Sequence, residues 1–368
     1  MRIAIDARLV SYSLGGISQY TIRLVRAMAA LGSGDELILL ESRRGTDGVA
    51  WPDSVRRIPM VSPPHNRFEQ ITLPMELLRV QADLLHSPDF VPPFRRRFRS
   101  VITIHDLAFI RFPHLLTDES ARYYGQVARA VESADQIIAV SHSTAQDILE
   151  LLRADSAKVS VVYSAAAPDC RPLTPDEVRQ QRSLLKLPER YLLFVGTLEP
   201  RKNLPTLLEA FAPVWNRHGI PLLIVGGKGW LFQDLFDTRD RLGLEEGVGF
   251  VGAVPSAQLP YYYGCATCLV MPSLYEGFGL PALESMACGV PVVVSNVSSL
   301  PEIVGDAGLT VNPTDIDGLS AALETVILDE DLRRRLSRAG LERAGQFSWD
   351  RTARETLSVY HKALDGGN

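Results

Sequence analysis

Two glutamates eight positions apart, Glu276 and Glu284, stand in the densest motif of the chain, PSLYEGFGLPALESMACGV at residues 272–290. A carboxylate accepts hydrogen bonds at both oxygens, which suits it to the hydroxyls of a sugar or a ribose. Pro281 favours the first position of a helix, so Glu276 precedes that helix and Glu284 lies in its early turns. We expect both carboxylates to reach one pocket. For Glu284 alone, stabilisation by the helix dipole without any ligand is the favoured interpretation.

The glycines of this motif predict a close approach between the backbone and a ligand. Gly277 and Gly279 have no side chain that would obstruct it. The main-chain N–H groups of Phe278, Gly279 and Leu280 lie at the start of the predicted helix, where partial positive charge attracts anions. The loop is therefore suited to a diphosphate or to a sugar hydroxyl.

Arg201 and Lys202 follow an apolar segment, residues 191–195, that is typical of a buried strand. Two adjacent cations at the end of a strand would offset the charge that develops on a leaving diphosphate. An Arg-Lys pair before a helix is more often a solvated surface pair, and only its position after a strand favours the phosphate role. No paired-Asp motif is evident at a strand end, so the motifs predict chemistry without a metal ion.

The first half of the chain holds two weaker candidates. Gly15 and Gly16 stand between the first predicted strand and a helical stretch at residues 18–31, where a glycine turn can meet a phosphate. The pattern is not GxGxxG, which weakens a dinucleotide-binding interpretation. His105 ends another predicted strand and is suited to donate a hydrogen bond to a sugar oxygen. A buried histidine satisfied by Asp106 or by a backbone carbonyl explains His105 equally well on local grounds.

These residues require parallel strands to position them. Short β-branched runs alternate with longer helical patterns, which is the signature of βαβ units. The alternation occurs twice, and 368 residues exceed what one hydrophobic core usually supports. We expect two α/β domains of the Rossmann type, with the chemistry on loops that follow strands. The predicted strands are residues 3–6, 37–41, 84–87, 101–104, 137–140 and 159–163 in the first half, and 191–195, 222–225, 248–251, 267–271, 290–295 and 309–311 in the second.

Composition and charge narrow the function. The net charge of −5 argues against a nucleic-acid partner, because binding a phosphate backbone normally requires a basic surplus. No apolar run approaches the roughly 20 residues of a membrane-spanning helix. The first residues carry Asp6 and Arg8 where a signal peptide would be apolar, so we expect a cytoplasmic protein. Cys265 and Cys268 form a lone CxxC, and two buried packing residues explain it better than a zinc or redox site.

The chain resembles glycosyltransferase family 4, retaining enzymes with the GT-B fold, over essentially its whole length. The resemblance is carried by the segment from Ser273 to Pro281 together with Glu284, which matches the family's E-x7-E element. Residues 196–204, 252–255 and 295–307 support it. The resemblance implies an α/β protein of two facing Rossmann-like domains with a deep interdomain cleft.

A proline-rich segment with a charged helical stretch, residues 168–189, is the expected interdomain hinge, and an ordinary surface connection inside one large sheet is the alternative. The acceptor-side domain would span residues 1–168 and the nucleotide-sugar-binding domain residues 190–347, with a linker at 169–189. A terminal helix at about residues 348–364 would return to the first domain.

Each candidate residue receives an implied role. Glu276 would contact hydroxyls of the donor sugar, and Glu284 the ribose of the nucleotide. Arg201 and Lys202 would hold the diphosphate. The remaining contacts would come from main-chain groups at Phe278, Gly279 and Leu280, from Gly15 and Gly16 near the diphosphate, and from His105 in the sugar site. The predicted catalytic residues are His105, Arg201, Lys202 and Glu276.

The implied function is retaining transfer of a hexose from a nucleotide sugar, linked to GDP or UDP, to a glycan or lipid-linked acceptor in cell-surface polysaccharide synthesis. The motifs resemble those of bacterial polysaccharide mannosyltransferases, which favours GDP-mannose. No cofactor is expected besides this donor. Two alternatives stay open: a non-catalytic nucleotide-sugar binding protein, and another GT-B enzyme such as a nucleotide-sugar epimerase.

A basic and aromatic stretch runs from Phe94 to Arg99 in the acceptor-side domain. Arg95, Arg96 and Arg97 are suited to an anionic membrane surface or to a lipid-diphosphate acceptor, which would place the protein peripherally at the inner membrane face. A solvated loop is the more frequent explanation of such a run. The sequence leaves the oligomeric state open.

Overall fold

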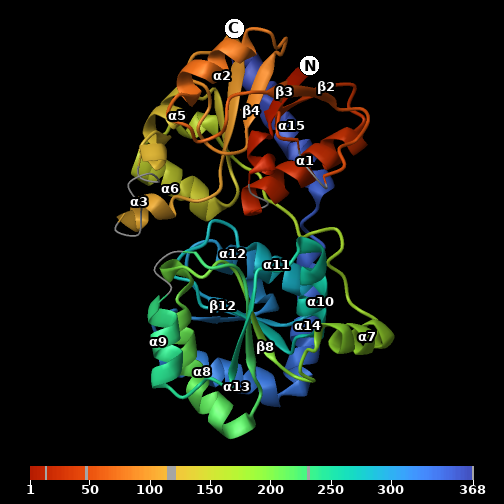
Figure 1. Ribbon diagram of the computed structural model, residues 1–368, viewed down its shortest axis with the longest axis vertical. Coiled ribbons are helices and arrows are strands. Elements are labelled where there is room, and N and C mark those ends of the chain that lie inside the picture. The colour runs from red at the N-terminus through yellow and green to blue at the C-terminus, as the bar shows by residue number, and fades with distance from the viewer. Residues whose placement is uncertain (13–14, 46–48, 114–121, 230–232, 367–368) are drawn as a thin grey trace. The chain divides into compact units, whose positions relative to one another are not determined.

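The computed structural model describes residues 1–12, 15–45, 49–113, 122–229 and 233–366 (Figure 1). The chain forms two compact units, one from Met1–Ser164 with Ser348–Asn368 and the other from Ala165–Phe347. Each unit is built on its own parallel β-sheet. Among the described residues, no helix combines the length and apolarity needed to cross a bilayer.

The first unit contains a seven-stranded sheet in the order β3-β2-β1-β4-β5-β6-β7, with every neighbouring pair parallel. All six strands predicted for this half are present, and β3 is added at the edge of the sheet. The strands are β1 (Arg2–Asp6), β2 (Glu36–Ser42), β3 (Arg56–Met60), β4 (Leu84–Ser87), β5 (Arg99–Ile104), β6 (Gln136–Ala139) and β7 (Val159–Val161).

Helices cover this sheet, and capping side chains and glycines fix where they begin and end. Ser141 caps α6 by accepting a hydrogen bond from Thr144 N, and α1 ends at Gly32, whose φ of 59° suits a glycine. The last helix, α15 (Trp349–Asp365), packs against α1, and its Leu357 and Tyr360 join the core of this unit. The other helices are α1 (Gly16–Leu31), α2 (Glu69–Leu77), α3 (Ala108–Arg111), α5 (Val127–Ser133) and α6 (His142–Leu152), with 3-10 turns at Arg8–Ser11 and Ser156–Lys158.

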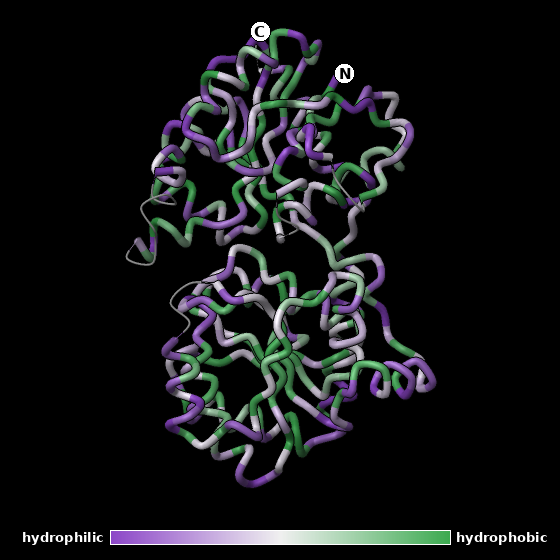
Figure 2. Tube along the Cα trace, in the orientation of Figure 1, coloured by the Kyte–Doolittle hydropathy of each residue, from purple (hydrophilic) through white to green (hydrophobic). Residues whose placement is uncertain are grey.

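The second unit contains a six-stranded parallel sheet in the order β10-β9-β8-β11-β12-β13. Hydrophobic residues concentrate in its central strands (Figure 2), because both faces of a parallel sheet are covered by helices. All six strands predicted for this half are present. They are β8 (Leu192–Val195), β9 (Leu222–Val225), β10 (Val248–Gly252), β11 (Cys268–Met271), β12 (Val292–Ser295) and β13 (Leu309–Val311).

The helices of the second unit begin within the segment suggested as a linker. Helix α7 (Pro175–Leu185) starts with a capping box between Thr174 and Glu177 and packs on α10. Residues 169–189 therefore lie within the second unit, and the first unit ends at Ser164. The other helices are α8 (Leu204–His218), α9 (Gln233–Arg241), α10 (Leu259–Cys265), α11 (Leu280–Ala287), α12 (Leu300–Val304), α13 (Ile316–Leu328) and α14 (Glu330–Ala344), with 3-10 turns at Pro200–Lys202, Ser256–Gln258 and Gly305–Ala307.

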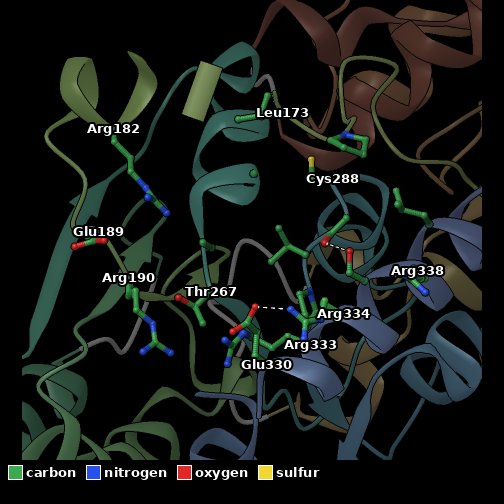
Figure 3. A pocket seen from close by; sticks show the side chains of 18 residues that line it. Leu173, Arg182, Glu189, Arg190, Thr267, Cys288, Glu330, Arg333, Arg334 and Arg338 are labelled. Atoms are coloured by element: carbon green, nitrogen blue, oxygen red, sulfur yellow. Dashed lines mark hydrogen bonds and ion pairs between the residues drawn. The ribbon is translucent and has the colours of Figure 1, made fainter. Parts of the chain in front are cut away.

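An arginine-lined pocket of about 570 Å³ lies at the amino ends of β8, β11 and β12 (Figure 3). Three of its five arginines bind the carboxyl ends of helices: Arg190 and Arg333 both donate to Ile327 O in the last turn of α13, and Arg182 donates to Cys265 O at the end of α10. Cations there offset the negative end of each helix dipole. The pocket has a structural explanation and lies at the edge of the sheet opposite the one where α/β folds bind ligands.

Candidate active site

The strand order of the second unit predicts where a ligand binds. Chain connections run from β8 outward to β9 and β10 on one side, and through β11 to β12 and β13 on the other. The carboxyl ends of β8 and β11 therefore flank the point where the strand order reverses, at which doubly wound sheets form a crevice. Arg201 and Lys202 follow β8, and Glu276 follows β11. The topology brings these three predicted residues to one place.

Glu276 lies between two cations. Lys202 Nζ is 2.6 Å from Glu276 Oε1, and Arg201 Nη1 is 3.2 Å from Oε2. Ser273 Oγ donates to Oε1 at 2.7 Å. The side chains of Glu276 and Lys202 are only 8% and 9% exposed. Burial raises the pKa of Glu276, but attraction to Lys202 and Arg201 outweighs it, so the pKa lies below its ordinary value. The carboxylate is therefore ionised at neutral pH.

Further polar residues hold the two loops together. Arg201 Nε is 2.7 Å from Glu199 Oε1, so this guanidinium is shared between two carboxylates. Asn203, in the left-handed conformation with φ 58°, donates to Pro272 O at 3.1 Å and to Pro313 O at 2.7 Å. The Asn203 amide thus ties the loop after β8 to the loop after β11. Sequence reasoning missed Glu199 and Asn203, although an asparagine that tolerates a positive φ after a strand was an available signal.

The backbone of Glu276 is fixed as well as its side chain. Glu276 N donates to Ser298 Oγ at 2.9 Å, and Ser299 Oγ donates to Glu276 O at 2.9 Å. Both serines follow β12, the next strand of the sheet. The contacts from Ser298 and Ser299 were not predicted, because they depend on which strands become neighbours. The contact from Ser273, in the same loop as Glu276, was not predicted either.

Helix α11 begins at the predicted glycine loop. Gly279 is its N-cap residue, with φ 100°, a conformation that favours glycine, and a Cβ there would lie 2.7 Å from Leu300 Cδ2. Pro281 stands in the first turn, and Gly289, with φ 73°, follows the end of the helix. Phe278 is buried and meets Phe347 edge-on, with ring centroids 6.1 Å apart. Packing thus fixes the loop that carries the main-chain groups of Phe278, Gly279 and Leu280.

Glu284 has a different hydrogen-bond partner from Glu276. It is buried on α11, and Tyr263 Oη donates to its Oε2 at 3.1 Å. Tyr263 is itself fully buried, and burial raises the pKa of its phenol well above the ordinary value, so the hydroxyl keeps its proton. That Glu284 and Glu276 reach one pocket remains a prediction.

In the first unit, His105 lies at the end of β5 and is held by the backbone. His105 Nε2 is 2.9 Å from Pro88 O, and its ring meets Tyr20 edge-on at 4.8 Å. Burial lowers the pKa of His105, which makes the imidazole neutral at neutral pH. A neutral ring that donates from Nε2 presents Nδ1 as an acceptor. The hydrogen bond to Pro88 O is the backbone interaction that local reasoning had offered as the alternative to a sugar contact.

Gly15 and Gly16 begin helix α1. Gly15 is the N-cap residue, with an extended backbone, and Gly16 is the first helical residue. A Cβ built on Gly16 meets no atom within 4 Å, so protein packing does not explain the glycine. Open space above a helix start suits an approaching anion.

A charged cluster at the carboxyl ends of β1 and β4 was not predicted. Arg8, almost fully buried, is 2.7 Å from Asp6 and 2.5 Å from Glu69. Glu69 accepts from His65 N at 2.9 Å, and His65 Nε2 is 2.5 Å from Asp89 Oδ2. Burial lowers the pKa of His65, but the hydrogen bond to Asp89 and the charges of Asp89, Glu69 and Asp6 together outweigh burial, so the pKa is raised. Asp6 and Arg8 had served only to argue against a signal peptide.

Two family models match the chain and together cover most of it. The model described as "Glycosyltransferase Family 4" matches residues 14–169, and the model described as "Glycosyl transferases group 1" matches residues 176–343. Among curated proteins, the O-antigen chain mannosyltransferase B of Escherichia coli is 32% identical, over 98% of this chain and 99% of its own length.

Solved structures share the fold over the full chain. Sucrose-phosphate synthase from Thermosynechococcus elongatus superposes with a TM-score of 0.81 at 24% identity and covers 100% of both chains. Anabaena HepE in complex with UDP-glucose superposes with a TM-score of 0.75 at 19% identity, covering 97% of this chain and 99% of its own. At these identities the likeness concerns the fold.

Proposed function

The chain belongs to glycosyltransferase family 4, and we propose that it is a retaining, metal-independent hexosyltransferase that uses a nucleoside-diphosphate sugar. Glycosyl transfer follows from the family. The GT-B fold that the motifs predicted is confirmed by the two parallel-sheet domains and the structural neighbours. The retained configuration, the absence of a metal and the roles of individual residues belong to the proposal.

One observation supports the donor site above all: Glu276 is buried between Lys202 and Arg201 at the strand-order reversal of the second unit. Lys202 has three N–H donors, and the ion pair uses one of them. A diphosphate arriving beside the ion pair would attract both cations. Glu276 would then accept hydrogen bonds from hydroxyls of the donor sugar. Lys202 and Arg201 would thus turn from the Glu276 carboxylate to the diphosphate with little rearrangement of the loops.

The proposed chemistry follows from these charges. The bond between the anomeric carbon and the phosphate oxygen breaks, and the acceptor hydroxyl forms a new bond to that carbon on the same face of the sugar. The leaving phosphate oxygen takes the proton of the acceptor hydroxyl. Lys202 and Arg201 stabilise the negative charge that develops on the diphosphate. The nucleoside diphosphate leaves carrying that proton, and the anomeric configuration is retained.

The donor and acceptor are proposed from relatives. The printed name of the Escherichia coli relative describes an O-antigen chain mannosyltransferase, which supports GDP-mannose as donor and a growing cell-surface glycan or lipid-linked acceptor. HepE, solved with UDP-glucose, supports a UDP-sugar as the competing donor. A cytoplasmic location, with peripheral contact at the inner membrane face, belongs to the same proposal.

The first test is a thermal-shift panel of GDP-, UDP-, ADP- and TDP-sugars on wild type, on Lys202→Met and on the matched control Lys362→Met, an exposed lysine of the first unit. A ligand at about 100 times its Kd stabilises the folded state by about 2.7 kcal/mol. One nucleotide sugar should raise the Tm of wild type and of the control but not that of Lys202→Met. An equal rise in all three proteins, or no rise with any donor, would contradict the proposed donor site.

The reaction itself is tested with the donor that the panel identifies. Nuclear magnetic resonance of the product should show the same anomeric configuration as the donor, and activity should survive a chelator. An inverted product, or loss of activity that a divalent ion restores, would contradict the mechanism. Donor binding without turnover on any acceptor would favour the non-catalytic alternative.

A further inference from the structure

The outer face of helix α2 is apolar although it lies at the surface. Phe68, Ile71, Met75 and Leu78 are 51%, 63%, 64% and 62% exposed. Their spacing of three, four and three residues puts them on one side of the helix. We call these four residues the α2 stripe. They include some of the most exposed large apolar side chains of the described chain.

This stripe departs from the usual pattern of a surface helix. The inner face of α2 is also apolar, because Leu73 and Leu77 are buried in a core cluster with Ile38 and Leu40. A helix with one face in the core normally presents polar residues on the other. Exposed apolar patches of this kind mark surfaces that bind a partner or a membrane.

The arginines beside the stripe divide into two groups. Arg96 donates to Pro93 O and Ser133 O, and Arg99 forms an ion pair of 2.7 Å with Asp135, so both hold their own segment in place. Arg95 and Arg97 are exposed and form no ion pair with another described residue. Only part of the basic stretch is thus available to a partner.

Three residues of the stripe and the available arginines line one pocket. A pocket of about 930 Å³ is lined by Ile71, Met75 and Leu78 on one side and by Arg95 and Arg97 on the other. Arg129, on α5, also lines it, and its guanidinium lies 4.0 Å from the centre of the Phe94 ring. The surface therefore combines apolar walls with a cationic rim.

The carboxylates of α2 do not neutralise this rim. Glu69 is buried against Arg8, and Glu76 accepts hydrogen bonds from Val61 N at 2.7 Å and Ser62 N at 2.8 Å. The charge beside the stripe is thus positive. An apolar strip flanked by arginines is complementary to a bilayer whose headgroups carry negative charge.

We propose that this face of the first unit docks on an anionic phospholipid bilayer. The α2 stripe enters the boundary between headgroups and acyl chains, and Arg95 and Arg97 bind lipid phosphates. The inference rests on the peripheral membrane contact of the proposed function and assigns it to a surface. Its failure would leave the donor site untouched, because it uses none of the residues assigned to the donor. Of the four arginines in the basic stretch, only Arg95 and Arg97 would bind lipid.

The test is co-sedimentation of the full chain with vesicles of equimolar phosphatidylcholine and phosphatidylglycerol, and with pure phosphatidylcholine vesicles. Wild type should bind the anionic vesicles and release them at high salt. Arg95→Ser with Arg97→Ser should weaken binding by about fivefold for each arginine. Ile71→Gln with Met75→Gln should weaken binding by at least about tenfold, because the affinity scales with the apolar area that enters the bilayer.

Matched controls come from the second unit. Arg335→Ser with Arg338→Ser removes the same charge from an exposed helix, and Leu184→Gln with Leu328→Gln removes similarly exposed apolar side chains. Both controls should bind like wild type, and circular dichroism checks that every variant is folded. The proposal is overturned if wild type ignores anionic vesicles, or if the controls lose as much binding as the patch variants. It is also overturned if the patch variants change only the oligomeric state, which would make the stripe an interface between copies of the chain.

Discussion

At the scale of single residues, Lys202 carries more of the charge balance of the candidate site than Arg201. Its Nζ is the nearer cation to Glu276, at 2.6 Å against 3.2 Å, and Arg201 is also engaged by Glu199. A buried carboxylate that loses one partner is left with an uncompensated charge, which is strongly unfavourable. Lys202 is therefore expected to matter for stability as well as for binding.

Lys202→Met should lower the free energy of unfolding by about 3–5 kcal/mol at neutral pH. In wild type the lowered pKa of Glu276 gives stability that is present above its ordinary value near 4.5 and is lost as the pH falls through the folded-state pKa. In the variant only Arg201 opposes the effect of burial, so the pKa of Glu276 is higher than in wild type. As the pH falls, Glu276 of the variant therefore takes up a proton at a higher pH, and the cost of its uncompensated buried charge disappears. Chemical denaturation should show the gap between the two proteins narrowing in acid. A constant or widening gap would contradict the ion-pair account, and Lys362→Met should behave as wild type.

The members of the candidate site could be predicted at this scale, but their pairing could not. Residue type and strand-end position singled out Arg201, Lys202 and Glu276, and their roles toward phosphate and sugar stay predictions. Glu276 and Lys202 are separated by 74 positions, and they meet only because β8 and β11 pair in parallel. Ser298, on a third strand end, was beyond any local pattern for the same reason.

At the scale of elements, α15 is attached to the first sheet through a buried histidine. Tyr360 Oη on α15 is 2.7 Å from His86 Nδ1 on β4, and His86 Nε2 is 2.8 Å from Thr103 Oγ1 on β5. Burial, with a smaller contribution from His105, lowers the pKa of His86 to about 3. The imidazole is therefore neutral in the folded protein wherever the fold is stable.

This attachment predicts a dependence of stability on pH. An unfolded histidine takes up a proton below about pH 6.5 and buried His86 does not, so the unfolded state gains protons first and stability falls between about pH 6.5 and 3. The free energy of unfolding of wild type should exceed that of His86→Gln at neutral pH, and this difference should shrink by at most about 1.4 kcal/mol for each unit that the pH falls in that range. Denaturation of both proteins from neutral to mildly acidic pH measures it. If the variant does not fold, the imidazole resonances of wild type serve instead, and protonation of His86 near pH 6 in the folded state would refute the account.

Strand β3, which sequence reasoning missed, has a physical explanation. Strand β3 contains Pro59 and two arginines, a composition that argues against a central strand. It lies at the edge of the sheet, where only one side needs backbone partners. The apolar outer face of α2 was also missed, because periodicity alone does not reveal which face of a helix a fold covers.

At the scale of the whole molecule, the second unit is inserted in the sequence between the two segments that form the first unit. Residues 165–347 are continuous and have their own hydrophobic core, whereas the first unit is completed only by residues 348–366. Ala353, Leu357 and Tyr360 of α15 fill the first core. The two units therefore differ in how much of the chain each needs.

Residues 165–347, made as a separate protein, should fold and unfold cooperatively and keep the thermal response to the donor. Residues 1–164 without α15 should not fold, because the core residues on that helix are missing. Circular dichroism melting of the two fragments measures this, and adding a synthetic peptide of residues 348–366 to the shorter fragment is the control. A stable, cooperative fragment 1–164 would show that α15 is dispensable.

The return of α15 has a consequence during protein synthesis. After residue 164 leaves the ribosome, residues 165–348 must still be translated before α15 begins, which takes about 10 to 40 s at ordinary elongation rates. For that period the first domain lacks α15 and exposes the core residues that this helix later covers, while the second domain is still being translated. The second domain is complete in sequence before α15 begins, so it can fold first. The domain that is translated first is therefore the one completed last, and it is the one that nascent-chain chaperones would have to protect.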